Sequence, residues 1–276
     1  MKPFRLLSEH ELQELASRIE EFYRRITRWG IATPATLYTL VELIEEKRCV
    51  VEYATDVGED CNKILRRSPE RFVEIVTGIV VGSLPLLQTD QKEVGFDSHP
   101  TNWCRDDAGR FTYVDFKPPR YYDEQSATHW VGFPQPEDPE DVRIGTWRYY
   151  SREGILRRLN FTCERYGPGK GRATILDTLD NTDPVCGRWA REYLDSLPPT
   201  RVRRDPCLFR SEVERLSPDD TDDLRELAVV AVELFDASSQ LLEEVLTLSH
   251  VSYRRPRADR HAGFEKARAL LLQLHS

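Results

Sequence analysis

The 276-residue chain contains six cysteines, but no two of them form a C-x-x-C pair. In a chain of this length such a pattern is neither a disulfide framework nor a zinc site. Cys49 and Cys104 lie in apolar, strand-like runs, where we expect buried thiols. The longest apolar stretch, Ile75 to Leu87, is interrupted by Thr, Gly, Ser and Pro and is too short for a membrane span of about 20 residues. The opening Met-Lys-Pro-Phe-Arg lacks the apolar segment of a secretory signal. We therefore expect a cytoplasmic protein.

An excess of positive charge is also missing. The formal net charge is −8, with 39% hydrophobic and 31% charged residues, which is ordinary for a globular domain. An acidic balance argues against broad binding to nucleic acid or anionic membranes, because both require dense Lys and Arg. The two short basic clusters, 201–204 and 254–257, are flanked by acids and are interpreted as solvated loops. The single Met and the many Arg residues suggest a GC-rich bacterial source.

The first half of the chain alternates helical and strand-like patterns. Ser8 and Glu11 form a capping-box pattern that begins a helix ending at Gly30. Residues 37–44 and 48–53 are apolar-rich and predict two antiparallel strands. A second helix is predicted from Ser68, with Pro69 in its first turn, and Pro85 is expected to kink or end it.

The second half is predicted to be mainly helical, after a loop. Residues 117–150 are interpreted as a loop because of their prolines and interspersed acids, the prolines being Pro118, Pro119, Pro134, Pro136 and Pro139. From Ser151 onward helical spacing prevails. Helices are expected to begin at Asp183-Pro184 and Ser217-Pro218, the latter broken near 236–239. Gly167–Thr174 resembles a phosphate loop only superficially, since Gly171-Arg172 follows Gly169-Lys170 where the motif requires Ser or Thr, and the segment before it is helical in pattern where the motif requires a strand.

The most informative segment is Gly95–Trp103 together with Tyr113–Phe116. Asn102 follows Asp97 by five residues, and Asp115 follows Asn102 by thirteen. The acidic turn 106–110, with Gly109, lies between two apolar segments and predicts a hairpin carrying Asn102 on one side and Asp115 on the other. A carboxylate that orients a hydroxyl and oxygen ligands for magnesium are the main needs of phosphoryl transfer.

This pattern resembles the aminoglycoside phosphotransferase and choline kinase branch of the protein-kinase-like superfamily. The family pattern D-x-H-P-x-N, an acidic turn and a strand ending in Asp is matched by Asp97-Ser-His99-Pro100-Thr-Asn102, 106–110 and 111–115. The resemblance implies that Asp97 orients or deprotonates the acceptor hydroxyl. It also implies that Asn102 and Asp115 bind magnesium and that ATP is the phosphoryl donor. His99 is expected to orient backbone or Asp115.

The resemblance further implies an α+β, protein-kinase-like fold. Residues 1–55 would form a reduced small lobe of one helix and short antiparallel strands, ending in a hinge. Residues 56–276 would form a helical large lobe with the hairpin 95–116 and the loop 117–150. Glu52-Tyr-Ala-Thr-Asp-Val-Gly58 resembles the family's E-Y-x-x-x-G hinge. Glu52 and Ala54 are therefore the candidates for main-chain contacts to adenine.

One family feature is missing from the sequence, because no G-x-G-x-x-G phosphate lid occurs in it. Lys2 is the candidate for the phosphate-contacting lysine, with Glu11 or Glu14 as its ion-pair partner. Losing one donor to charge-developing oxygens typically costs on the order of 10²–10³ in rate. Three readings stay open: a pseudokinase, an enzyme that relies on metal and large-lobe groups, or a site completed by a partner protein or upstream sequence.

These observations favour a phosphotransferase that moves the γ-phosphoryl of ATP to a hydroxyl of a small molecule or peptide. The alternatives are a pseudokinase binding module within a larger complex and nucleotidyl transfer on the same three residues, since fold does not fix reaction. The acceptor pocket would be formed by the loop 117–150 and the C-terminal helices, and its chemistry cannot be read from the sequence.

Overall fold

The computed structural model describes residues 8–44, 47–90, 93–116, 120–121, 129–130, 139–167, 169–250 and 256–275. The chain is an α+β protein dominated by helices, with small antiparallel sheets. It divides into two compact units, residues 1–158 and 159–276. The lobe boundary at residue 55 stays a prediction, because this division reflects compactness and not function. None of the described helices combines the length and the apolar character needed to cross a bilayer.

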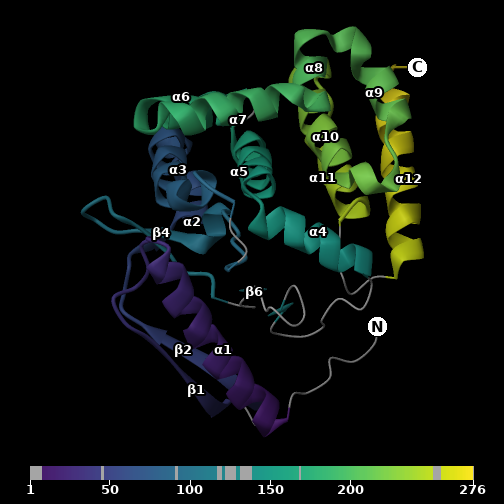
Figure 1. Ribbon diagram of the computed structural model, residues 1–276. Helices are drawn as coiled ribbons and strands as arrows, with labels where there is room; N and C mark the ends of the chain where they lie inside the picture. The colour runs from purple at the N-terminus through teal and green to yellow at the C-terminus, as the bar shows by residue number, and fades with distance from the viewer. Residues whose placement is uncertain are drawn as a thin grey trace. The chain divides into compact units, whose positions relative to one another are not determined.

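The first unit contains the strands and four complete helices among its described residues (Figure 1). Its elements are α1 (Glu9–Arg28), β1 (Leu37–Ile44), β2 (Lys47–Ala54), β3 (Glu59–Asp60), α2 (Cys61–Arg67), α3 (Phe72–Leu87), β4 (Trp103–Arg105), β5 (Phe111–Tyr113), β6 (Arg120–Tyr121), β7 (His129–Trp130), α4 (Pro139–Tyr150) and the start of α5 (Arg152–Tyr166). The sheets are β1-β2, β3-β4-β5 and β6-β7, all antiparallel.

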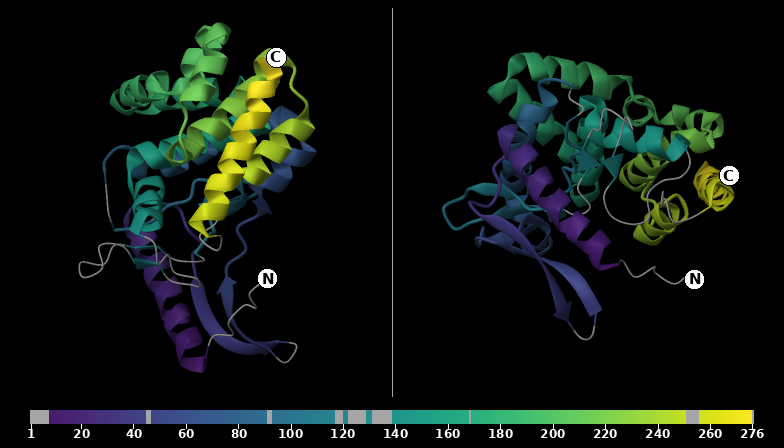
Figure 2. Two further views of the ribbon diagram at one scale, coloured as in Figure 1. Left: turned by 90° about the vertical axis from the view of Figure 1, so that its right-hand side faces the viewer. Right: turned by 60° about the horizontal axis from the view of Figure 1, so that its bottom comes forward.

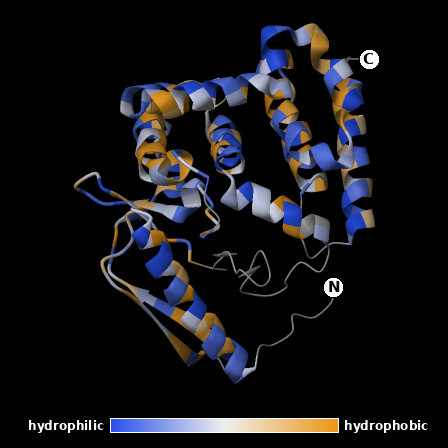
Figure 3. Ribbon diagram, in the orientation of Figure 1, coloured by the Kyte–Doolittle hydropathy of each residue, from blue (hydrophilic) through white to orange (hydrophobic). Residues whose placement is uncertain are grey.

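Helix α1 packs along the β1–β2 ribbon, as both views in Figure 2 show. The capping box at Ser8 is present, which confirms the predicted start of the helix. In Figure 3 both hydrophilic and hydrophobic residues occur along α1, and its buried residues are Leu12, Ala16, Ile19, Phe22 and Ile26. Thr39 of β1 ties the two elements together, because its hydroxyl donates to the Ala16 carbonyl at 3.2 Å and its N–H to Glu20 at 2.9 Å. Helix α1 is therefore attached to one face of the β1–β2 ribbon.

Helix α3 lies directly against the β4–β5 hairpin. It runs two residues past Pro85 and ends at Leu87, so this proline does not terminate it. Gly78 and Gly82 allow the close approach: a methyl group at Gly82 would lie 2.5 Å from the buried Trp103 ring. Behind the hairpin, aromatic rings pack edge to face, among them Phe96 on Trp103 with centroids 6.1 Å apart. The hairpin is thus seated in a close-packed aromatic layer.

The expectation that residues 117–150 form a loop is wrong for the last part of this range. Residues 139–150 form helix α4, with Pro139 at the first helical position. Proline is favourable there, because the first helical N–H has no intrahelical partner and the fixed φ suits a helix. Within the rest of the expected loop, residues 117–119, 122–128 and 131–138 lie outside the described residues.

The second unit is helical in its described part. Its elements are the end of α5, then α6 (Gly171–Thr182), α7 (Pro184–Ser196), α8 (Pro198–Arg204), α9 (Phe209–Arg215), α10 (Thr221–Phe235), α11 (Ser239–Leu248) and α12 (Arg257–Leu272). The predicted start at Asp183 is confirmed, since its carboxylate accepts the N–H groups of the first turn of α7. The predicted break near 236–239 is confirmed as well, with Asp236 left-handed at φ 52°. Helices α10, α11 and α12 lie side by side around one apolar core (Figure 1).

A buried carboxylate organises the start of α6. Glu164 is only 3% exposed and accepts the N–H of Arg172 at 2.7 Å and that of Gly169 at 3.3 Å. These N–H groups lie at the helix N-terminus, where they have no intrahelical acceptor. Arg203 pairs with the same carboxylate and also binds Glu233 at 2.9 Å. Glu164, which is a residue of α5, therefore caps α6.

The first basic cluster is not the loop expected from its sequence. Residues 201–204 lie in α8, and their guanidinium groups bind acids of the same unit. Arg204 pairs with Asp195 at 2.9 Å, and Arg201 reaches Glu212 at 3.5 Å. This pairing fits the interpretation that the cluster is not a binding patch. In the second cluster, residues 254 and 255 lie outside the described residues, and Arg257 is the first residue of α12, so it does not lie in the expected loop.

We predict that Gly82→Ala lowers the free energy of unfolding by about 1–2 kcal/mol. Overpacking against the buried Trp103 ring costs about 1–3 kcal/mol, whereas replacing a helical glycine by alanine returns at most about 1 kcal/mol. Denaturant unfolding measures the difference. Val81→Ala on the exposed side of the same helix is the control and should change stability by less than about 0.5 kcal/mol. A Gly82→Ala protein as stable as the wild type would contradict the close packing.

We predict that Glu164→Ala lowers the free energy of unfolding by about 2–3 kcal/mol, because it removes the buried partner of Arg203, which keeps only Glu233, and leaves buried polar groups without an acceptor. The N-terminal N–H groups of α6 lose their acceptor in the same change. Glu243→Ala removes the exposed partner of Arg165 and should cost less than about 1 kcal/mol. Equal unfolding midpoints for the two variants would show that Glu164 does not cap α6.

Candidate functional site

The predicted hairpin is present with the predicted turn. Strands β4 and β5 pair antiparallel, with Trp103 opposite Tyr113 and Arg105 opposite Phe111. Gly109 has φ 81° and its N–H donates to the Asp106 carbonyl at 3.0 Å. The Arg110 N–H donates to the Asp106 carboxylate at 2.8 Å, and this hydrogen bond holds the pKa of Asp106 below its ordinary value. The turn is therefore fixed by its own acid, as the sequence indicates.

Asn102 joins the loop to the hairpin with both its side chain and its main chain. Its Nδ2 donates to the Asp97 carbonyl at 3.0 Å, and its own carbonyl accepts the Val114 N–H at 2.9 Å. The first bond fixes the amide orientation, so Oδ1 is directed away from the Asp97 carbonyl. Oδ1 accepts from the Thr101 hydroxyl at 3.2 Å. The side-chain oxygen of Asn102 is thus held on the side away from the Asp97 carbonyl.

Asp115 follows the last paired residue of the hairpin. The pairing of Asn102 with Val114 extends the β4–β5 ladder by one step, and Asp115 is the following residue. An amide oxygen and a carboxylate are the hard oxygen donors that magnesium prefers, usually completed by water and phosphate. The two residues therefore carry the kinds of donor atom that magnesium prefers. Within the described residues no group of three or more His, Cys, Asp and Glu side chains is arranged for a metal.

The Asp97 side chain forms an ion pair that the sequence analysis missed. Arg158 Nε donates to Oδ1 at 2.6 Å and Nη2 donates to Oδ2 at 2.8 Å, a two-pronged contact. Asp97 is 13% exposed and Arg158 is 30% exposed. The guanidinium also lies over the Tyr149 ring, 5.4 Å from its centroid. The two partners are 61 residues apart in sequence, and no motif marks Arg158.

The residues around Asp97 are attached to the same stretch of chain. The Phe96 N–H donates to the Tyr149 carbonyl at 2.8 Å, and the Ser98 hydroxyl donates to the Ile155 carbonyl at 3.4 Å. Three consecutive residues, 96–98, therefore contact residues 149–158. Both segments belong to the first compact unit. The position of Asp97 depends on α4 and α5 as well as on its own loop.

His99 stabilises the backbone of the loop, as one of its two expected roles requires. Its Nδ1 accepts the Thr101 N–H at 3.1 Å and lies 2.8 Å from the Thr101 hydroxyl. The His99 N–H itself donates to Asp97 Oδ1 at 3.2 Å. The imidazole therefore shapes the turn that leads from Asp97 to Asn102.

The hinge candidates Glu52 and Ala54 lie on β2. Glu52 is opposite Thr39, whose N–H points away from β2 to reach Glu20. In an antiparallel ladder, two residues opposite each other either both direct their main-chain N–H and C=O groups toward the partner strand or both direct them away from it. The N–H and C=O groups of Glu52, and of Ala54 two residues later, therefore face away from β1. This is the orientation that an adenine contact requires.

Gly58 brings the end of the hinge against the hairpin. It has φ 96°, and a methyl group there would lie 2.2 Å from the Arg105 carbonyl oxygen. The next residues, β3, pair with β4, with Asp60 opposite Cys104. The hinge candidate and the hairpin are thus joined through one short sheet.

The remaining candidate, Lys2, lies outside the described residues. The described residues give other contacts of the two acids expected to pair with it. Glu11 accepts the Ser8 N–H at 2.7 Å, and Glu14 pairs with Arg18 at 3.0 Å. The catalytic role of Lys2 stays a prediction.

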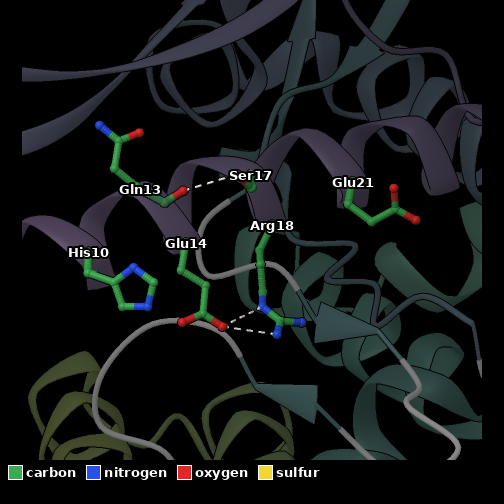
Figure 4. A pocket seen from close by; sticks show the side chains of 6 residues that line it. All are labelled: His10, Gln13, Glu14, Ser17, Arg18 and Glu21. Carbon is green, nitrogen blue, oxygen red and sulfur yellow. Dashed lines mark hydrogen bonds and ion pairs between the residues drawn. The ribbon is translucent and has the colours of Figure 1, made fainter.

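A hollow of about 490 Å³ lies beside α1 (Figure 4). Its described lining comes from one helix and consists of His10, Gln13, Glu14, Ser17, Arg18 and Glu21. Figure 4 shows Ser17 bonded to Gln13 and Arg18 to Glu14 within that helix. These are the side chains of a solvated helix face, and among the residues named for the site the described lining includes only Glu14, one of the two expected partners of Lys2.

Two thiols lie beside the hairpin. Burial raises the pKa of the Cys61 thiol to about 12, and the nearby Cys104 and Asp60 raise it further. Cys61 is the first residue of α2, a position that normally lowers a thiol pKa, but burial outweighs this effect. Burial also raises the pKa of Cys104. Cys49 and Cys104, expected to be buried, are partly exposed, so that expectation is wrong.

No protein-family model, curated protein or solved structure matches the chain.

We predict that Cys207 is the first thiol to react with an aromatic disulfide reagent at about pH 8. Cys207 is exposed, whereas Cys61 is buried and stays protonated. Cys207→Ser should remove the fast phase, and Cys61 should react only when denaturant unfolds the chain. Labelling of Cys61 in native protein as fast as that of Cys207, read by peptide mass, would contradict the burial.

Proposed function

We propose that this chain is a kinase-like phosphotransferase that moves the γ-phosphoryl of ATP to a hydroxyl of a small molecule or peptide. The observation that supports it most is the hydrogen bond from the Asn102 amide to the Asp97 carbonyl at 3.0 Å. With the main-chain bond from Val114 to Asn102, it brings the base candidate and both metal-ligand candidates into one small structural element. An ordinary polar hairpin has no need of such a link.

In this proposal the residues have separate roles. Asp97 orients or deprotonates the acceptor hydroxyl, and Asn102 Oδ1 and the Asp115 carboxylate hold magnesium. Bound magnesium would neutralise charge on the phosphates. The main-chain groups of Glu52 and Ala54 accept and donate at the adenine edge. Phosphoryl transfer requires positioning and charge neutralisation more than covalent help, so these few groups suffice for its chemistry.

The proposal includes a partner protein that completes the small lobe. No glycine-rich loop occurs in the sequence, and Lys2 is the only lysine proposed to contact phosphate. The ribbon face away from α1 carries exposed apolar side chains, and Tyr38 stacks on Tyr53 with ring centroids 5.1 Å apart. Strands of a partner packed on this face would bury these rings and bring further donors to the phosphates.

A binding module without catalysis is the second candidate. The ion pair between Asp97 and Arg158 favours it, because a carboxylate held by both oxygens can serve as a purely structural link. Titration with ATP and magnesium separates a nucleotide-binding protein from a scaffold. Saturation at about 100 times Kd stabilises a protein by about 2.7 kcal/mol, whereas a scaffold shows no shift in its unfolding midpoint.

We predict that the purified chain converts Mg-ATP slowly to ADP with water as acceptor, and that Asp97→Ala and Asp115→Ala each lower this rate by about 10²-fold or more. Asp115→Ala removes a metal ligand, so its defect should shrink as magnesium rises, whereas the defect of Asp97→Ala should not. Release of ADP is the measurement, and EDTA should abolish it.

Asp107→Ala, in the exposed turn of the same hairpin, is the matched control and should leave the rate unchanged. Product mass spectrometry separates phosphoryl from nucleotidyl transfer. Wild-type turnover that survives both Asp97→Ala and Asp115→Ala would remove the basis of the proposal.

A further inference from the structure

We infer that Arg158 is a positioning residue for the proposed reaction, which fixes the orientation of the Asp97 carboxylate toward the acceptor hydroxyl. The inference rests on the proposed function and adds a residue that no motif contains. Arg158 acts through Asp97 and has no assigned contact with substrate.

The contact has the geometry of a fixed fork. Two parallel N–H donors meet the two oxygens of one carboxylate at 2.6 and 2.8 Å. A planar guanidinium in this arrangement fixes the rotation of the carboxylate plane, which a single ammonium cannot do. Arg158 projects from helix α5 and its guanidinium lies over the Tyr149 ring. The fork is therefore carried by regular structure and not by the loop that it orients.

The two oxygens of Asp97 are not equivalent. Oδ1 accepts from Arg158 Nε and also from the His99 N–H at 3.2 Å. A carboxylate oxygen has two lone pairs, so Oδ1 is filled by these two donors. Oδ2 accepts from Arg158 Nη2. These three hydrogen bonds together hold the Asp97 carboxylate in one orientation.

The ion pair also selects between the two roles considered for Asp97. Both carboxylate oxygens of Asp97 already accept hydrogen bonds from Arg158, so we assign to Asp97 the role of orienting the hydroxyl. In the transfer, the acceptor oxygen bonds to the γ-phosphorus and the bond from that phosphorus to the bridging oxygen breaks. ADP leaves with the electron pair, and the hydroxyl proton passes to solvent. A loose transition state needs this orientation more than early deprotonation.

The test uses the full chain with Mg-ATP and water as acceptor, measured by ADP release. Arg158→Gln should lower kcat by about 10- to 100-fold, the usual cost of a misplaced reacting group, while KM for ATP changes by less than about twofold. Arg158→Lys keeps the charge without the fork and should lose an intermediate amount. In Arg158→Ala, added free guanidinium should restore part of kcat. Arg165→Gln is the control, because Arg165 is on the same helix and pairs with Glu243 at 2.7 Å.

A second readout needs no activity. Unfolding midpoints of Asp97→Asn, Arg158→Gln and the double variant form a double-mutant cycle. Because the two side chains interact, we expect that the effects of the two single variants on stability do not add. Additive effects would overturn the inference, because Arg158 then does not hold Asp97 in solution. If Arg158→Gln does not fold, Arg158→Lys and the double variant carry the test, since the latter leaves no unpaired charge.

The possible failures can be told apart. Suppose that the wild type turns over ATP, that Asp115→Ala abolishes this turnover, and that Arg158→Gln behaves like Arg165→Gln. The positioning role is then wrong, and the proposed function stands. If the wild type neither binds nor turns over Mg-ATP, the proposed function fails and the positioning role with it, even where the cycle shows a coupled pair. Loss of kcat with unchanged KM, and its recovery with guanidinium, supports the inference.

Discussion

The Asn102 side-chain amide donates to the Asp97 carbonyl, and the rest of the candidate site depends on this bond. A loop of four residues between two polar side chains can adopt many shapes, and an amide anchored at one end limits them. With Nδ2 engaged, only Oδ1 can face a cation. The same residue starts the hairpin through the Val114 N–H, so the strand that leads to Asp115 begins where the loop is fixed. Local hydrogen bonds therefore set the spacing of the three polar residues.

Close packing transmits this local order to the rest of the first unit. Gly82 lets α3 approach the Trp103 ring, and Gly58 lets the chain after β2 pass against the Arg105 carbonyl. Both contacts leave no room for a Cβ, so the hairpin is held between a helix and the end of a strand ribbon. A site built on such contacts is more rigid than a site on a surface loop.

The elements that the sequence predicts well are those with local signals. The Ser8 capping box, the Asp106–Arg110 turn and the Asp183 cap each satisfy backbone groups within a few residues, and each is present. Helix α4 was missed because the prolines around it suggested a loop, although Pro139 at a first helical position is compatible with a helix. Arg158 and Glu164 could not be found from spacing. Their partners are brought close by tertiary packing, and one arginine in an arginine-rich helix resembles any other. The hairpin and its turn were thus readable from the sequence, whereas the groups that hold them in place were not.

Charge explains why the ion pair matters in a chain without a phosphate lid. A carboxylate beside a triphosphate repels it, and two like charges about 4 Å apart interact by about 4 kcal/mol at an effective dielectric constant of about 20. Lid and lysine donors normally offset this repulsion, and here the sequence has no glycine-rich loop. Arg158 makes Asp97 part of a neutral pair. The negative charge that Asp115 contributes is the one that a magnesium ion would require. In the proposed site, pairing Asp97 with an arginine therefore lets a carboxylate orient the acceptor without opposing the nucleotide.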